Sequence, residues 1–434
     1  MPTDLRTRLQ RLRAQKVQRA VLTDAPAPPA EAAFERRPAG VAPLPYSDEL
    51  PGQPVTTAQG AYQLIETAYA LDFQHGPNRL SDLLAYEAAA CARLARDEGF
   101  LGADLRSLAF IDTETTGLAG GAGTLVFLVG VGVCVGDQFV LRQYFLRDPS
   151  EEQALLTALV ADLAPRTGWV TFNGRAFDMP LLETRLTLNR QRGALGRRPH
   201  LDLLAPARRL YRGRLPSCSL GVIEQQVFHI LREHDDVPGY LIPQMYLDYL
   251  RTRDPREMRR VIYHNTVDIL SMVTLAAHLL EVFAGEGAAP RARTAARSPE
   301  DSLRLALWHD DNGRAAEAEA AYRQALGLRL TLDDRGVGLR RLALLFKRQQ
   351  RRADMAPLWE QLASFTVDDP ECFIELAKYY EWHAPDLSKA QAWAERAAAV
   401  VNSGPRGWQR DEAMAALQHR LARIERKRAG KEAA

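Results

Sequence analysis

The chain has 434 residues, of which 46% are apolar and 25% are charged, and its formal net charge is +2 at pH 7. A chain of this length contains about two to four domains, and its apolar content is sufficient for packed cores, which excludes a largely disordered chain. A net charge this close to zero gives no global basic field. Any nucleic-acid site must therefore come from a local cluster of cations.

The four cysteines are widely spaced and include no C-x-x-C pair, so we expect neither a zinc site nor a disulfide framework. A reducing cytoplasm is the expected location. Residues 1–20 are basic and lack the apolar centre of a secretory signal. The longest apolar run, residues 125–135, has about half the roughly 20 residues of a membrane span. We therefore expect a soluble chain with no membrane partner.

The chain before residue 104 divides into two predicted parts. Residues 1–54 combine a short basic helix with an arm rich in Pro and Ala, a composition typical of extended segments. Residues 55–103 are expected to form a helical preface packed on the next domain. The helical pattern covers residues 61–96, where leucines recur at helical intervals after a Gly-Pro break.

Residues 104–283 have the mixed pattern of an α/β domain. Three apolar strands are predicted in hairpin order, at residues 108–112, 124–135 and 138–145. The elements expected after them are a helix that ends near residue 163, a strand at 169–172, a helix at 178–192, a strand at 200–204 and a helix at 256–283. This order is that of the ribonuclease H-like fold, a mixed five-stranded sheet with flanking helices, although the pattern alone permits other α/β topologies.

Residues 284–299 are rich in Gly, Ala and Pro and are predicted to be a linker, and residues 300–425 look helical throughout. Within them a Leu-Ala pair recurs 37 and then 34 residues apart, and an aromatic residue follows each Leu by 17 positions. This period favours tetratricopeptide-like repeats, which would bind an unidentified protein partner. An ordinary helical bundle with coincidental spacing is the alternative.

The most informative stretch is residues 108–117, an apolar strand that ends with Asp112 and Glu114. Side chains at positions i and i+2 of a strand point to the same face, so the two carboxylates lie close together and repel each other. A divalent cation would relieve this repulsion, because hard cations prefer oxygen ligands. We therefore predict a metal site at this strand end.

Two further acids have contexts that fit such a site. Asp178 follows Asn173 and Gly174 where a helix begins, although an acid at this position is also explained as a helix cap. Asp268 lies on a helix that should face the core on one side. His264 stands about one turn earlier and shares a face with Asp268, so it is a candidate for the same site, unless it simply lines the surface or the core.

These motifs resemble those of a known superfamily. Asp112-x-Glu114, the Asn-Gly-x-x-Phe-Asp motif that ends at Asp178, and the His-Asn-x-x-Asp motif that ends at Asp268 resemble the DEDD 3′-5′ exonucleases, which have the ribonuclease H-like fold. The stretch from Asp112 to Gly121 and the His-Leu-Asp-Leu-Leu motif are also similar to the YprB-like predicted exonucleases. Members of that family often carry C-terminal tetratricopeptide repeats, and the resemblance covers about residues 50–283.

The resemblance implies a metal-dependent nuclease that hydrolyses phosphodiester bonds of DNA or RNA, with 3′-5′ exonuclease activity. Two Mg²⁺ or Mn²⁺ ions would be held by four carboxylates, those of Asp112, Glu114, Asp178 and Asp268. One ion would help to form hydroxide from water, and the other would stabilise the leaving 3′ oxygen. Asp112 is expected to bridge the two ions.

The chain departs from the superfamily at the general base. One branch places a Tyr four residues before the last Asp, and the other places a His five residues before it. Here His264 stands four residues before Asp268 and Tyr263 stands five before it, so the two identities are exchanged. We favour His264, since imidazole titrates near neutral pH and shares a helix face with Asp268. Tyr263 is the alternative.

A cluster of nine arginines between residues 185 and 214 contains one acid, Asp202, which we expect to cap the following helix rather than bind metal. Such a local basic patch neutralises phosphates, although a solvated charged face is the alternative. The residues predicted to contact substrate are Thr115, Asn173, Arg185, Arg208 and Arg209.

Two other functions stay open at this point. The chain could bind nucleic acid or act as a scaffold through its repeats without cleaving, or it could be an endonuclease or junction-resolving enzyme on the same fold. All four acids are present, which disfavours the first alternative, because a site that binds no metal has no need to hold carboxylates that repel one another.

Overall fold

The computed structural model describes residues 49–117, 123–232, 236–283 and 299–432, together with Leu44, Ser47 and the short strand β1 (Arg37–Pro38). The predicted basic helix, nearly all of the arm and the linker at 284–298 lie outside the described residues.

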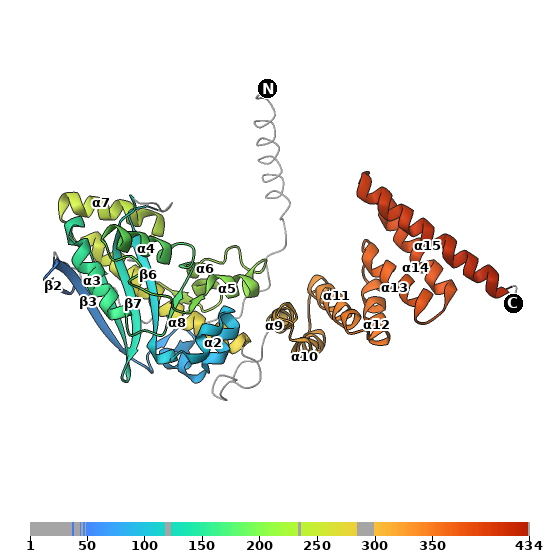
Figure 1. The fold of residues 1–434 in the computed structure, drawn as a ribbon, viewed down its shortest axis with the longest axis horizontal. Coiled ribbons are helices and arrows are strands. Elements are labelled where there is room, and N and C mark those ends of the chain that lie inside the picture. The colour runs from blue at the N-terminus through green and yellow to red at the C-terminus, as the bar shows by residue number, and fades with distance from the viewer. Residues whose placement is uncertain are drawn as a thin grey trace, which may run out of the picture. The chain divides into compact units, whose positions relative to one another are not determined.

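A seven-stranded sheet is the centre of the first domain (Figure 1). Its strand order is β10-β9-β6-β7-β8-β3-β2, in which β10, β9 and β6 run parallel and the remaining neighbours pair antiparallel. The strands are β2 (Gln53–Thr57), β3 (Gly60–Ala70), β6 (Leu108–Thr115), β7 (Val126–Val135), β8 (Gln138–Phe145), β9 (Gly168–Thr171) and β10 (His200–Asp202). The sheet thus has seven strands, and the prediction of five was wrong.

The two additional strands come from the segment that we predicted to be a helical preface. Residues 60–70 form β3, which pairs along its length with β8, and β2 pairs with β3 at the sheet edge. Tyr62 and Ile65 are buried, and the segment is rich in aromatic and β-branched residues, which suit a pleated surface. Only the end of the preface is helical, with the 3₁₀ helix η1 (Leu80–Ala85) and the helix α2 (Ala88–Ala95).

The central helix of this domain is α8 (Arg256–Phe283), whose bounds are those predicted. It is long and apolar enough to cross a membrane, but 83% of its most apolar window is buried inside the protein, as in a core helix. It packs on β6 and β7 and thereby brings its own polar residues to the end of β6. The other helices here are α3 (Glu152–Leu163), α4 (Asp178–Leu188), α5 (Leu204–Tyr211), α6 (Leu220–Gln226) and α7 (Ile242–Thr252).

Short elements complete the domain. They are the strands β4 (Gln74–His75), β5 (Asn78–Arg79) and β11 (Ile230–Leu231), and the 3₁₀ helices η2 (Glu98–Gly102), η3 (Leu105–Ser107), η4 (Pro149–Glu151) and η5 (Gly239–Leu241).

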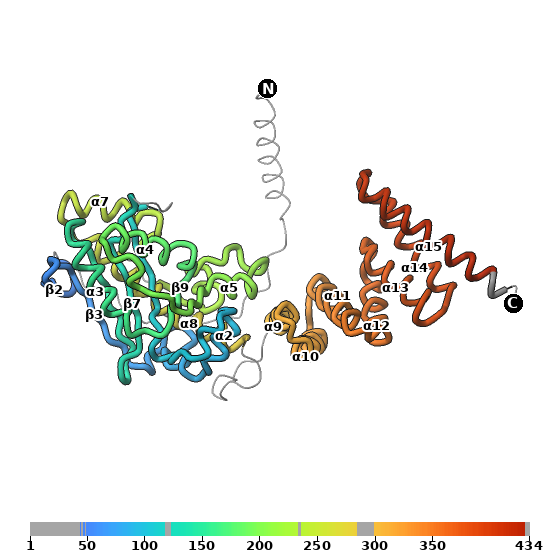
Figure 2. The backbone as a smooth tube through the Cα atoms, in the orientation of Figure 1, coloured from blue at the N-terminus to red at the C-terminus, as the bar shows by residue number. Residues whose placement is uncertain are grey.

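The C-terminal region is helical, as predicted, and consecutive helices pack in pairs, α9 with α10, α11 with α12, and α13 with α14 (Figure 2). The recurring Leu-Ala pairs lie in its core, where each of these residues is at most 4% exposed. Their tetratricopeptide character stays a prediction. The helices are α9 (Pro299–Asp311), α10 (Ala315–Leu326), α11 (Leu332–Arg348), α12 (Arg352–Ala363), α13 (Pro370–Trp382), α14 (Leu387–Ser403) and α15 (Trp408–Glu432).

Candidate metal centre

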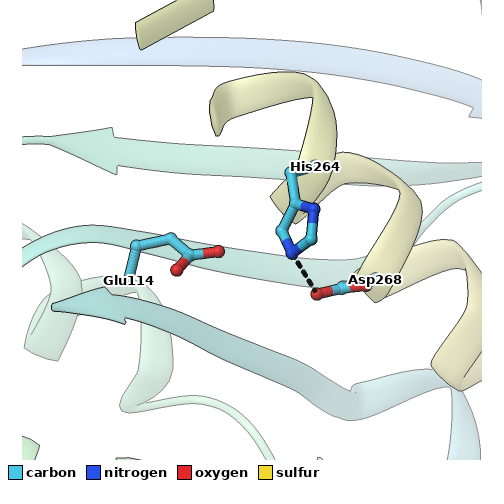
Figure 3. Close-up of side chains that lie close together, drawn as sticks. All are labelled: Glu114, His264 and Asp268. Carbon is cyan, nitrogen blue, oxygen red and sulfur yellow. Dashed lines mark ion pairs between the residues drawn. The ribbon is translucent and has the colours of Figure 1, made fainter. Parts of the chain in front are cut away.

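The end of β6 and one face of α8 meet at a cluster of ionisable side chains. Glu114 extends from the strand towards His264 and Asp268, which lie one turn apart on α8 (Figure 3). One potential ligand atom from each of these three residues lies within 4.8 Å of the other two. The predicted pairing of a strand-end carboxylate with this helix face is therefore present in the structure.

Asp178 joins the cluster from the first residue of α4. Its carboxylate is 5% exposed and accepts hydrogen bonds from the backbone N (3.1 Å) and the Oγ1 (2.5 Å) of Thr113. Thr113 lies between Asp112 and Glu114 on β6, so these bonds fix Asp178 beside the two strand-end acids. Burial raises the pKa of Asp178 to about 6, although the bonds from Thr113 act in the opposite direction.

The surroundings of the two strand-end acids, Asp112 and Glu114, favour their protonated forms. Burial, followed by the charges of Asp268, Glu114 and Asp178, raises the pKa of Asp112 well above its usual value. Burial also raises the pKa of Glu114 to about 8, despite the nearby cationic groups of His264 and Arg232. Carboxylates that crowd one another in this way favour protonation unless a cation enters among them.

Asn265 orients Asp112, a role that we did not predict. It is fully buried, and its Nδ2 donates to Asp112 Oδ2 at 2.8 Å, while its own Oδ1 accepts from Gln143 Nε2 at 2.8 Å. A Cβ at Gly130 on β7 would come within 2.3 Å of Asn265 Oδ1, so this strand position has room only for glycine. The sequence signal was a glycine inside a buried apolar strand, which often marks a close approach.

Arg232 is a second residue that sequence reasoning missed. Its guanidinium donates two bonds of 2.7 Å to Glu224, which is 1% exposed, and it also contacts Asp268. Arg232 therefore links Asp268, the last of the four candidate metal ligands, to the buried carboxylate of Glu224 on α6. The signal was an arginine directly after the apolar pair of β11, since a charge at such a position needs a partner.

His264 bridges two acids. Its Nδ1 lies 2.7 Å from Asp236 Oδ1, and its Nε2 lies 3.4 Å from Asp268 Oδ2. Burial by itself lowers the pKa of an imidazole, but the charge of Asp268 and the bond to Asp236 together raise the pKa of His264 to about 9. Tyr263, in contrast, is 2% exposed and packs in the hydrophobic core. The geometry thus favours His264 as the base, a role that stays a prediction.

Two of the residues predicted to contact substrate have structural partners. Thr115 is 5% exposed, and its Oγ1 donates to Gly117 O at 2.8 Å. Arg185 forms an ion pair of 2.6 Å with Glu152, which joins α4 to α3. These contacts stabilise the fold locally, and the substrate roles of Thr115 and Arg185 stay predictions.

The other predicted substrate residues lie near the end of β9 and on α5. Asn173 and Arg208 are exposed, whereas Arg209 is half-buried close to Arg96, and burial and this neighbour lower the pKa of Arg209. Asp202 accepts hydrogen bonds from the backbone N of Asn173 (2.8 Å) and of Leu204 (3.0 Å). It thus orders the loop after β9 and the start of α5, in keeping with the capping role that we predicted.

The donor set fits hard divalent cations. The four carboxylates supply the oxygen ligands that Mg²⁺ and Mn²⁺ prefer, and no cysteine takes part among the described residues. His264 lies within ligand distance of Glu114 and Asp268, but an imidazole is a ligand typical of softer metals, so we do not count it among the ligands of these ions. Neighbouring groups hold three of the four acids in place, namely Asp112, Asp178 and Asp268. Such outer contacts are typical of metal centres.

Comparison with known proteins agrees with the geometry. A model of the RNase_H superfamily matches residues 109–280, a range that contains all four acids. The uncharacterized protein YprB of Bacillus subtilis (strain 168) is 32% identical over 343 residues, which are 76% of this chain and 79% of the relative. The chain belongs to the YprB family. Its residues 109–280 form a domain of the RNase_H superfamily, and members of this superfamily are generally nucleases that use divalent metal ions.

Proposed function

We propose that this YprB-family chain is a metal-dependent 3′-5′ exonuclease that hydrolyses phosphodiester bonds of nucleic acid with two bound Mg²⁺ or Mn²⁺ ions. The observation that carries the proposal is the convergence of Asp112, Glu114, Asp178 and Asp268 on one site, where burial and the charges of the other three acids raise the pKa of Asp112. Membership of the RNase_H superfamily supports the hydrolase class.

The ions would be held by these four acids, with Asp112 as the bridge, and they would activate water and stabilise the leaving 3′ oxygen. The protein orients three of the four ligands. Asn265 holds Asp112, Thr113 holds Asp178, and Arg232 holds Asp268.

His264 accepts the proton of the attacking water at Nε2, the nitrogen that faces Asp268. Its other nitrogen, Nδ1, lies against Asp236, which keeps the ring in place and stabilises the imidazolium that forms. This arrangement resembles other general bases oriented by a carboxylate.

We further propose that helices α9 to α15 are tetratricopeptide-like and bind a protein partner, and that the chain acts in the cytoplasm. The paired helices and their buried Leu-Ala positions support the first part. The four free cysteines support the second.

End-labelled DNA and RNA, single-stranded and duplex, test the activity with Mg²⁺ and with Mn²⁺. We expect metal-dependent release of mononucleotides from the 3′ end and much slower release by Asp112→Asn. A chain that releases nothing from any of these substrates is not a nuclease of this kind, and equal activity of Asp112→Asn would refute the metal centre. Cleavage of closed circular substrates would identify an endonuclease instead.

A further inference from the structure

A polar cleft of about 810 Å³ opens where β9 ends, and two of the residues predicted to contact substrate, Asn173 and Arg208, line it. Binding sites for small ligands measure about 300–1,000 Å³, so the cleft has room for more than a single ion. Its walls come from the end of β9, from α5 and from the loop before α6. The lining includes Phe172, Asn173, Arg208, Arg212 and Cys218, and its other described residues are uncharged.

The inner end of the cleft is next to the metal centre. Strands β9 and β6 are parallel neighbours, with Val170 opposite Phe110. Two residues beyond this pair are Asp112, the expected bridging ligand on β6, and Phe172, which lines the cleft and directly follows the end of β9 at Thr171. Asp202 fixes the next residue, Asn173, by accepting from its backbone N at 2.8 Å, and Asn173 has the left-handed φ of 67°. The wall beside the metal centre is thus held in one conformation.

The cleft is basic. Arg208 and Arg212 are exposed and lie one turn apart at the end of α5, and the lining described above contains no Asp or Glu. Arg185 and Arg209 do not line it, although they belong to the same arginine-rich segment. Among the arginines of this segment, Arg208 and Arg212 therefore line the cleft with exposed guanidiniums, whereas Arg185 and Arg209 have other surroundings. Paired arginines without competing acids are suited to phosphate oxygens.

Phe172 adds an aromatic surface to this basic cleft. Phe172 is half-buried and directly follows β9, the strand that neighbours β6 and its Asp112. Aromatic side chains bind unpaired bases by stacking, whereas bases in a duplex are already stacked on each other. A basic cleft with an aromatic residue at its inner end therefore favours a single strand over a duplex.

We propose that this cleft binds the sugar-phosphate backbone of single-stranded nucleic acid, with Arg208 and Arg212 on phosphates and Phe172 against the base nearest to the metal centre. The inference rests on the proposed nuclease function and names the form of its substrate. The phosphate backbone is common to DNA and RNA, so both are used in the tests.

Cys218 provides a direct probe of the cleft, since it is half-buried and lines it. Cys134 on β7 is also half-buried but lies outside, and the other two cysteines are buried. We expect a bound oligonucleotide to slow alkylation of Cys218 severalfold in the full-length protein without metal, and to leave alkylation of Cys134 unchanged. Mass spectrometry measures both rates, with single-stranded and duplex forms of DNA and of RNA.

Charge reversal tests the two arginines. In Arg208→Glu/Arg212→Glu we expect about tenfold weaker binding of a labelled single strand, measured by fluorescence anisotropy. The slope of log K against log salt should fall by about 1.4, because each phosphate contact to a single strand contributes about 0.7. The matched control is Arg192→Glu/Arg197→Glu, which reverses two exposed arginines of the same segment outside the cleft.

The outcomes separate this inference from the proposed function. Three results would refute the proposal that the cleft binds nucleic acid. They are binding of an oligonucleotide without protection of Cys218, equal loss of affinity in both double variants, and no binding at all. Protection of Cys218 by a strand that the protein never cleaves would support the cleft and refute the nuclease. Stronger protection by duplex than by single strands would overturn the choice of substrate form.

Discussion

Two regions of this chain contain buried carboxylates, and their surroundings shift the pKa of these carboxylates in opposite directions. At the candidate metal centre four acids lie close together, and burial together with the neighbouring acids raises the pKa of Asp112 well above its usual value. Arg232 and His264 are the cationic groups that face these acids among the described residues. These two cationic groups are too few to neutralise the charge of four carboxylates.

In the helical region Glu381 is screened from solvent completely, yet its ionised form is favoured. Three cations surround it, with Arg420 at 2.7 Å, Arg423 at 2.7 Å and Lys427 at 3.0 Å. Burial alone would raise the pKa of Glu381, but the hydrogen bonds from Arg423 and Lys427 outweigh it and lower the pKa to about 2.

The difference indicates what each region needs. A carboxylate that stabilises a fold is surrounded by cations of the protein itself, as Glu381 is. Carboxylates that are buried without enough neighbouring cations of the protein destabilise the fold. This loss of stability is offset where a cation from solution binds among them. Buried acids of this second kind are typical of functional sites.

The largest expected effect comes from neutralising the bridging ligand. Asp112→Asn should lower metal-dependent cleavage by about 10³-fold, or about 4 kcal/mol of activation free energy, because an amide cannot balance two cations. Glu381→Gln, the same chemical change in the other region, should leave the rate unchanged. Initial rates with Mn²⁺ measure both. Equal losses in the two variants would remove the distinction between the two kinds of buried acid.

The next effect concerns the proton acceptor. His264→Ala should lower the rate by about 10²-fold or more. His264 must be neutral to accept a proton. In the metal-free chain Asp268 and Asp236 outweigh burial and raise the pKa of His264 to about 9, and a cation bound to Asp268 would offset part of this effect. The wild-type rate should therefore increase with pH up to a value at or below about 9. The variant should lack this increase. Tyr263→Phe is the matched control, and if it abolished the pH dependence while His264→Ala preserved it, Tyr263 would be the base.

The sequence predicted those parts of the fold and site that have local signatures. The bounds of α8 and β8 were predicted correctly because apolar periodicity and clear breaks delimit them. The residues of β3 were assigned to a helix, since their strand character depends on pairing with β8, which lies about 75 residues away in the chain.

In the same way, the motifs identified the four acids as candidates, while the groups that orient them went unnoticed. Arg232 is significant only because the fold brings it to Glu224 and Asp268. The need for glycine at position 130 depends on Asn265, which is 135 residues later in the chain. Long-range contacts of this kind leave no local pattern, and a single sequence does not reveal them.

An intermediate effect should follow from displacing one such orienting group. In Gly130→Ala the new Cβ forces the Asn265 side chain away from Asp112, so affinity for Mn²⁺ and the cleavage rate should fall by about 10–100-fold. Gly102→Ala is the control, because a Cβ there meets no atom within 4 Å. Calorimetric titration measures the affinity. Unchanged Mn²⁺ binding in Gly130→Ala would show that Asn265 does not position the ligand.

Stability should respond to pH in opposite directions in the two regions. The pKa of Glu114 is raised to about 8 in the folded chain, against about 4.3 in an unfolded one. Ionisation therefore favours unfolding, and the metal-free catalytic domain should lose stability as pH rises from about 4 to about 8. Mn²⁺ at 100 times its dissociation constant should add about 2.7 kcal/mol.

Thermal unfolding of the full-length chain, with a chelator or with Mn²⁺, measures this change. Asp112→Asn should reduce both the pH dependence and the stabilisation by metal, because it removes one of the repelling charges and one ligand. A metal-free catalytic transition that is more stable at pH 8 than at pH 5 would contradict the interpretation of the crowded acids.

The smallest effect is expected in the helical region. Glu381→Gln should cost about 1–2 kcal/mol of stability, less than a fully buried ion pair, because the three cations are 17–32% exposed. The folded pKa of Glu381, about 2, is below its unfolded value of about 4.3, so its contribution is present above pH 4 and disappears as pH falls towards 2. Denaturation with urea at pH 7 and pH 3 measures the loss, with the exposed Glu425→Gln as control. If Glu381→Gln were neutral at pH 7, the cations around Glu381 would offset its burial without stabilising the helices, and only the metal centre would then distinguish the two regions.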